Sequence, residues 1–153
     1  MNAFTEPITH SGVLIVDDNA HNVELLQAYL EELGGMVRTA ADGLEAIASI
    51  EATPPDIVLL DIMMPRMSGF QVCEKIKRDP ATKDIPVIMV TALNEAGDVE
   101  RALDAGADDF LTKPVNKLEL LTRVKSLLKV RELKRELDLA MDEVKRLREA
   151  AGE

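Results

Sequence analysis

Several strand-like segments of this chain end in side chains that can take part in phosphate or metal chemistry. One apolar run of strand length ends in Asp61, and another runs directly into Asp17 and Asp18. Two further apolar runs end in Thr91 and Lys113. If these strands are parallel neighbours, their carboxyl ends meet at one edge of the sheet, which is where open α/β sheets bind ligands. The sequence therefore predicts one pocket containing these five side chains.

Three carboxylates in a small space repel one another, so a cation is expected among them. Oxygen ligands without His or Cys favour a hard divalent ion, and we expect Mg²⁺, with Mn²⁺ as a possible substitute. A carboxylate can attack a phosphoryl group in line when cations offset the charge on the transferring oxygens. Asp61 is the candidate nucleophile. Lys113 would bind one phosphoryl oxygen, and the Thr91 hydroxyl would donate to another.

The elements that would position these residues alternate between strand and helix, which predicts an α/β fold whose parallel sheet carries helices on both faces. The expected strands span about residues 12–16, 36–40, 57–61, 86–91 and 109–112. Expected helices begin at Ala20 after the cap Asn19, at Asp42 and Gly43, at Ser68 and Gly69, near residue 96 and near Lys117. The nearly all-apolar first and third strands predict central positions, buried on both faces.

The last predicted helix continues beyond the length that a compact domain needs. Apolar or small residues recur at alternating steps of three and four, as in the a and d positions of a coiled coil: Val130, Leu133, Leu137, Ala140, Val144, Leu147 and Ala151. We expect a flexible N-terminus over 1–11, a domain over 12–128 and a coiled-coil extension over 129–153.

The spacing favours a homodimer through this helix. In a parallel pair Glu143 would meet Arg148 of the second copy, whereas Lys129 and Lys134 would repel. With only about three heptads, the association should be weak on its own. An alternative is a single amphipathic helix that folds back on the domain.

Composition excludes several classes of partner. The net charge of −10 argues against binding to nucleic acid, which requires clustered Lys and Arg. Cys73 is the single cysteine, so no disulfide framework exists and a reducing cytoplasm is expected. No apolar run approaches the roughly 20 residues that cross a bilayer, and the N-terminus does not resemble a signal peptide, so no membrane partner is expected.

Several short motifs together resemble the receiver domain of two-component response regulators over about residues 12–128. They are Val-Asp-Asp at 16–18, Leu-Leu-Asp-Ile-Met-Met-Pro at 59–65, Gly69, Val-Thr-Ala at 90–92, Gly-Ala-Asp-Asp-Phe at 106–110 and Lys113-Pro114. From 65 to 114 the chain is especially similar to receivers that precede diguanylate cyclase or related output domains through a long helix.

The resemblance implies a doubly wound, five-stranded, flavodoxin-like sheet in the order 2-1-3-4-5 with an extended C-terminal helix. It implies that Asp61 is phosphorylated by a sensor histidine kinase or a phosphotransfer protein. It also implies that Mg²⁺ is held by Asp18, Asp61 and the Met63 carbonyl, with Asp17 acting through water.

The same resemblance assigns the signal-relaying residues. Thr91 and Ala92 would contact the phosphoryl group with Lys113, and the bond between Lys113 and Pro114 would be cis. Phe110 lies where the family has an aromatic switch residue that turns inward when Thr91 moves. The signal would pass through the C-terminal helix to an output domain or effector, and the chain is expected to be a regulatory segment of a longer protein, although the helix itself could recruit the effector.

Other residues receive structural interpretations. Asp108 and Asp109 precede a strand and are read as turn and surface residues, His10 and His21 as solvent-facing, and the methionines near Asp61 as packing residues. A constitutive dimerisation scaffold remains an alternative. A second alternative, an aspartyl-phosphate phosphatase, needs a second Asp two residues after the nucleophile, where this chain has Met63.

Overall fold

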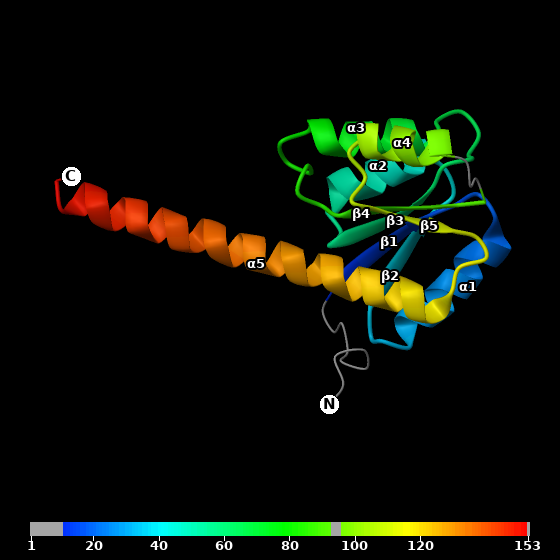
Figure 1. Ribbon diagram of the computed structural model, residues 1–153, viewed down its shortest axis with the longest axis horizontal. Coiled ribbons are helices and arrows are strands. Elements are labelled where there is room, and N and C mark those ends of the chain that lie inside the picture. Colours follow the sequence, from blue (N-terminus) through cyan, green and yellow to red (C-terminus); the bar gives the residue numbers. More distant parts are fainter. Residues whose placement is uncertain (1–10, 93–95, 153) are drawn as a thin grey trace.

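The sheet of this protein has five parallel strands. The computed structural model describes residues 11–92 and 96–152. The strands are β1 (Gly12–Val16), β2 (Met36–Ala40), β3 (Ile57–Asp61), β4 (Val87–Thr91) and β5 (Asp109–Thr112), in the order β2-β1-β3-β4-β5 (Figure 1). This is the expected doubly wound order, and its reversal between β1 and β3 creates the crevice in which such sheets bind ligands.

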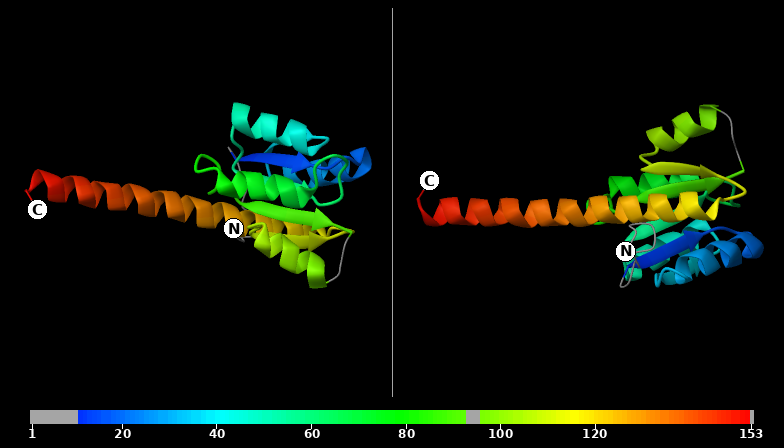
Figure 2. Two further views of the ribbon diagram at one scale, coloured as in Figure 1. Left: turned by 90° about the horizontal axis from the view of Figure 1, so that it is seen from above. Right: turned by 60° about the horizontal axis from the view of Figure 1, so that its bottom comes forward.

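In the described part of the chain, five helices cover the two faces of this sheet. They are α1 (Ala20–Glu31), α2 (Gly43–Ala52), α3 (Gly69–Arg78), α4 (Ala96–Asp104) and α5 (Lys117–Ala150). Helices α1 and α5 lie on one face, and α2, α3 and α4 on the other (Figures 1 and 2). The predicted cap Asn19 is confirmed, and Asp42 and Ser68, at the predicted helix starts, also act as caps. Each of the three side chains accepts a backbone N–H group in the first turn that follows.

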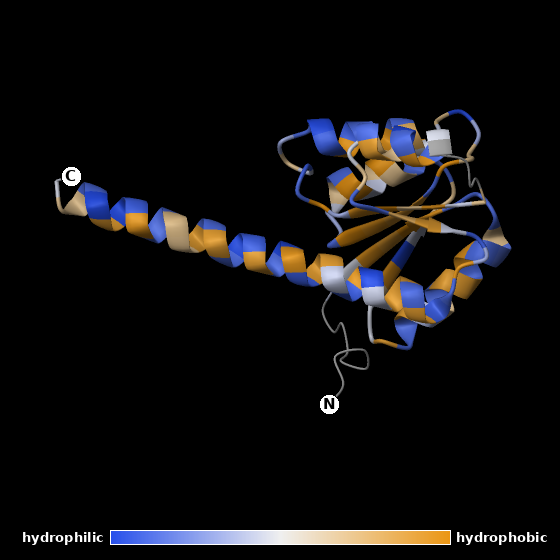
Figure 3. Ribbon diagram, viewed as in Figure 1, coloured by the Kyte–Doolittle hydropathy of each residue, from blue (hydrophilic) through white to orange (hydrophobic). Residues whose placement is uncertain are grey.

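Successive strand residues point to opposite faces and so build two hydrophobic cores. Ile15 and Leu59 pack toward α1 and α5, whereas Val16 and Leu60 pack toward α2, α3 and α4. All five residues of β3 are buried, as expected for a central strand with helices on both sides. Figure 3 shows the resulting band of hydrophobic strands between the more polar outer faces of the helices.

Helix α5 spans 34 residues, and its second half leaves the domain (Figure 1). The predicted long C-terminal helix is therefore confirmed, and it does not fold back over the domain as the alternative required. None of the helices within the described residues combines the length and hydropathy needed to cross a membrane. The expected flexible segment over residues 1–11 lies outside the described part of the chain, apart from Ser11.

Candidate functional site

Three carboxylates meet at the ends of the two central strands. Asp17 follows β1 and Asp61 ends β3, and they are only 3% and 5% exposed, whereas the neighbouring Asp18 is exposed. One oxygen from each of the three side chains lies within 4.8 Å of the others. The backbone N–H of Asn19 donates to Asp17 Oδ1 at 2.8 Å and fixes that carboxylate. The predicted convergence of these acids is therefore present in the structure.

Lys113 supplies the positive charge of this site. Its Nζ lies 3.0 Å from Asp17 Oδ2 and 3.6 Å from Asp61 Oδ1, so the ammonium sits between the two buried carboxylates. The Lys113 backbone N–H donates to the carbonyl of Thr91 at 2.8 Å, and the peptide bond to Pro114 is cis. Strand order thus brings residues 17 and 113 into contact although 96 positions separate them.

The electrostatic environment makes Asp61 an unusual aspartate. Burial raises its pKa from the ordinary 3.8 to about 6, and the negative charge of Asp17 adds to the rise. The positive charge of Lys113 and the Met63 N–H, which donates at 3.4 Å, act in the opposite direction. Asp61 therefore remains mostly ionised at neutral pH, but its carboxylate is more basic than that of an exposed aspartate.

The loop after β3 folds tightly back onto the end of that strand. The Gly69 N–H donates to the carbonyl of Ile62 at 2.9 Å, and a Cβ at Gly69 would lie only 2.2 Å from the carbonyl oxygen of Asp61. Glycine is thus required here because of close backbone approach, without a positive φ. Arg66 does adopt a φ of 69°, which is strained for a residue with a Cβ. The Met63 side chain is 63% exposed, at the outer side of the site.

The remaining predicted site residues lie at or near the same edge. Thr91 ends β4 and is fully buried, and Ala92 follows it at the surface. Phe110 lies in β5 opposite Met89, two residues before the strand end, and packs partly exposed against the core beneath α2, α3 and α4. Thr91 and Phe110 therefore lie in the neighbouring strands β4 and β5.

The donor set fits a hard divalent cation. Oxygen ligands come from Asp17, Asp18 and Asp61, and Asp18 is open to solvent, so a bound ion could retain waters. Burial and, after it, the charge of Asp17 raise the pKa of Asp61 despite the nearby Lys113. A bound cation would stabilise the ionised carboxylates.

Asp108 and Asp109, which the sequence pattern suggested to be turn and surface residues, also make specific ion pairs. Asp108 Oδ2 accepts from Lys77 Nζ and from the Val87 N–H, both at 2.8 Å, and so ties α3 to the start of β4. Asp109 pairs with Arg123 of α5 at 2.8 Å. Neither pair has a sequence signal, because the partners are far apart along the chain.

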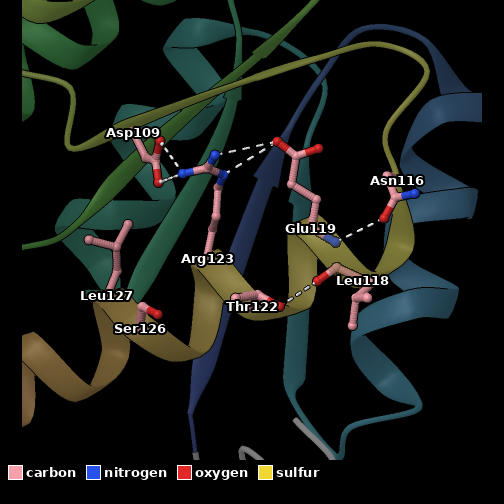
Figure 4. A pocket seen from close by; sticks show the side chains of 8 residues that line it. All are labelled: Asp109, Asn116, Leu118, Glu119, Thr122, Arg123, Ser126 and Leu127. Atoms are coloured by element: carbon pink, nitrogen blue, oxygen red, sulfur yellow. Dashed lines mark hydrogen bonds and ion pairs between the residues drawn. The ribbon is translucent and has the colours of Figure 1, made fainter.

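A hollow on the surface lies between β5 and the first turns of α5 (Figure 4). Figure 4 shows Arg123 reaching from α5 between Asp109 and Glu119, which it contacts at 2.8 and 3.4 Å. The side chain of Asn116 caps the same helix by accepting from the Glu119 N–H at 3.0 Å. The charged groups here pair with one another and lie apart from the carboxylates of the site.

Comparison with known proteins places these features in context. The family model described as "Response regulator receiver domain" matches residues 13–125. The response regulator PleD of Caulobacter vibrioides is 47% identical over 140 residues, which are 92% of this chain and 29% of PleD. The DNA-binding dual master transcriptional regulator RpaA of Synechocystis is 43% identical over 117 residues, 76% of this chain and 48% of RpaA. This chain thus spans less than half the length of either relative.

A solved structure extends the similarity to the fold. The response regulator receiver domain protein (CheY-like) of Methanospirillum hungatei has a TM-score of 0.76 and 33% sequence identity, covering 81% of this chain and 98% of that protein's chain.

Proposed function

This chain belongs to the response regulator receiver domain family, and from that premise we propose that it is a switch controlled by phosphorylation of Asp61. The observation that carries the proposal is the contact of Lys113 with both Asp17 and Asp61 inside a group of three carboxylates. Families of this kind are regulatory, so the chemistry of the site serves to change the protein's own state.

In the proposed reaction a carboxylate oxygen of Asp61 attacks phosphorus in line. A P–O bond forms, the P–N bond to a phosphohistidine of a sensor kinase or phosphotransfer protein breaks, and the imidazole leaves. The raised pKa of Asp61 supports this role, because a more basic carboxylate is a better nucleophile while it is still mostly ionised at neutral pH.

Mg²⁺, or Mn²⁺ in its place, would offset charge on the transferring oxygens when held by Asp18, Asp61, the Met63 carbonyl and, through water, Asp17. The Lys113 ammonium, already 3.6 Å from Asp61 Oδ1, would bind a phosphoryl oxygen. The hydroxyl of Thr91 and the backbone of Ala92, at the end of β4, would bind others.

The output step would begin when Thr91 moves toward the phosphoryl group and Phe110 turns inward. Helix α5 would then pass the change to an output domain or effector. Five residues of its apolar stripe are between 48% and 60% exposed although they have hydrophobic side chains: Val130, Leu133, Leu137, Val144 and Leu147. We propose that a second copy covers this stripe in a parallel coiled coil, with Glu143 of each chain near Arg148 of the other.

The test combines a phosphoryl mimic with sedimentation. Wild type and Asp61→Asn are incubated with Mg²⁺ and beryllium fluoride, and their association is followed by sedimentation velocity. We expect the mimic to change the oligomeric state of wild type alone, and truncation after Lys129 to reduce association in both proteins. No response of wild type would contradict the switch.

A constitutive dimerisation scaffold is the second candidate, and the exposed stripe is the observation that favours it. The scaffold predicts that beryllium fluoride leaves the dimerisation of both wild type and Asp61→Asn unchanged. The phosphatase alternative lacks support because Met63 cannot transfer a proton.

A further inference from the structure

Helix α5 is fastened to the domain at the point where its extension begins. Arg131 Nη1 donates to the carbonyl oxygens of Pro55 at 3.0 Å and Asp56 at 2.8 Å. These two residues come directly before β3, so the guanidinium binds the backbone at the start of the strand that ends in Asp61. Burial lowers the pKa of Arg131, and the nearby Arg135 adds to this, so its hydrogen bonds offset a real cost of desolvation.

Two further cations of α5 reach the same edge of the domain. Lys134 Nζ lies 2.5 Å from Asp84 Oδ1, in the loop before β4, and Arg135 Nη1 lies 3.7 Å from Asp56 Oδ1. Asp56 is itself held in place, because its other oxygen accepts the Gly12 N–H at 2.7 Å. The attachment point is therefore the start of the central strands, at the edge of the sheet opposite Asp61.

The direction of these contacts leaves the apolar stripe exposed. At about 100° per residue, Arg131 lies on the other side of α5 from Leu133 and Leu137. The pairing with Asp84 also offsets part of the charge of Lys134, which in a parallel dimer would face Lys129 of a second copy. The contacts thus turn the apolar stripe away from the domain and reduce the repulsion that the sequence predicted.

We propose that Arg131, Lys134 and Arg135 are positioning residues that form a basic clamp and fix the direction in which α5 leaves the domain. A solvent-exposed helix of some twenty residues is marginal in isolation because its first turn is costly to form. In α5 the turns packed on the domain through Leu120, Leu121 and Val124 supply that start, and the clamp extends the anchored part of the helix to Arg135. β3 spans about 13 Å between the clamp and Asp61. A role of the clamp in signalling rests on the proposed function. The contacts that form the clamp do not depend on that function.

Hydrogen exchange of the full, unphosphorylated chain tests the clamp, at a dilution where sedimentation velocity shows monomer only. Arg131→Met keeps the apolar stem and removes the donors. Amides over 129–140 should exchange roughly 10 to 100 times faster than in wild type, as the loss of charged hydrogen bonds to buried carbonyls implies. The matched control is Lys145→Met, which removes a cation exposed on the same helix ten positions beyond the clamp and should change exchange less than twofold.

A second variant keeps the test decisive if Arg131→Met also loosens the core. Asp84→Asn alters a surface carboxylate and should still accelerate exchange over 129–140 several-fold, while β1 and β3 keep their protection. Equal rates of amide exchange over 129–140 in Arg131→Met, Asp84→Asn and Lys145→Met would refute the proposed clamp. Modification by acetyl phosphate, measured on the same variants, should match wild type; its absence from every variant and from wild type would refute the proposed function and leave the clamp standing.

Discussion

Asp61→Asn should make the metal-free protein more stable at neutral pH, although it removes the carboxylate that we propose to be phosphorylated. The wild-type carboxylate has its pKa raised from 3.8 to about 6 by burial and by Asp17. At about 1.4 kcal/mol for each tenfold change in proton affinity, this gap corresponds to about 3 kcal/mol of destabilisation when the group is ionised. Asparagine has a similar shape and carries no charge, so the variant should recover up to that amount.

The sign of the pH dependence follows from the direction of the pKa change. Because the folded-state pKa of Asp61 is raised, its contribution to stability is fully present below pH 3.8 and is lost as the pH rises through about 6. The advantage of Asp61→Asn over wild type should therefore be near zero at pH 4, grow between pH 4 and 6, and level off above pH 7. Added Mg²⁺ should restore much of the wild-type stability at pH 7.5 and do less for the variant.

Urea unfolding of both proteins at several pH values, in EDTA and in Mg²⁺, measures this directly. Asp142→Asn serves as the control, since it neutralises an exposed carboxylate on the extension and should leave the pH profile unchanged. The reasoning would be refuted if Asp61→Asn were no more stable than wild type at pH 7.5 in EDTA, or if its advantage did not shrink toward pH 4.

Three further predictions concern the loop after β3 and the extension. Gly69→Ala should destabilise the fold by about 2 to 3 kcal/mol, since its Cβ would lie 2.2 Å from the Asp61 carbonyl oxygen; Gly97→Ala, with open space around it, should not, and equal urea midpoints would contradict this. Met63→Asn should shorten the lifetime of phosphoryl-Asp61 several-fold by orienting the attacking water, so an unchanged half-life after removal of acetyl phosphate would sink that idea. Leu137→Asp should weaken dimerisation at least tenfold, whereas the same change at Leu139, an exposed leucine off the apolar stripe, should not. Equal dimer affinities of the two variants in sedimentation equilibrium would show that the interface is misassigned.

Local patterns were enough to predict the elements of this fold. Alternating apolar runs, helix-start residues such as Asn19 and Ser68, and the breaks at glycine and proline located the strands and helices within a few residues of their observed bounds. The convergence of Asp17, Asp61 and Lys113 followed from the parallel sheet, because the carboxyl ends of its strands share one edge. Strand order itself came only from the family resemblance.

The contacts that the sequence did not reveal are those whose partners are set by tertiary geometry. Arg131 looks like any solvated cation of an amphipathic helix, yet it binds backbone carbonyls about 75 positions away. Asp109 was read as a surface residue and proved to pair with Arg123. Gly69 was recognised as a helix start, but the close approach of its backbone to Asp61 appears only in three dimensions. Such residues carry no periodic signal, because their roles depend on which loops meet.

The most direct test of the central claim is the intact mass of the protein after incubation with acetyl phosphate. The account predicts the addition of one phosphoryl group to wild type in Mg²⁺, little addition in EDTA, and none to Asp61→Asn. A wild-type mass that stayed unchanged in Mg²⁺, or an equal gain in Asp61→Asn, would contradict the assignment of Asp61 as the phosphoryl acceptor.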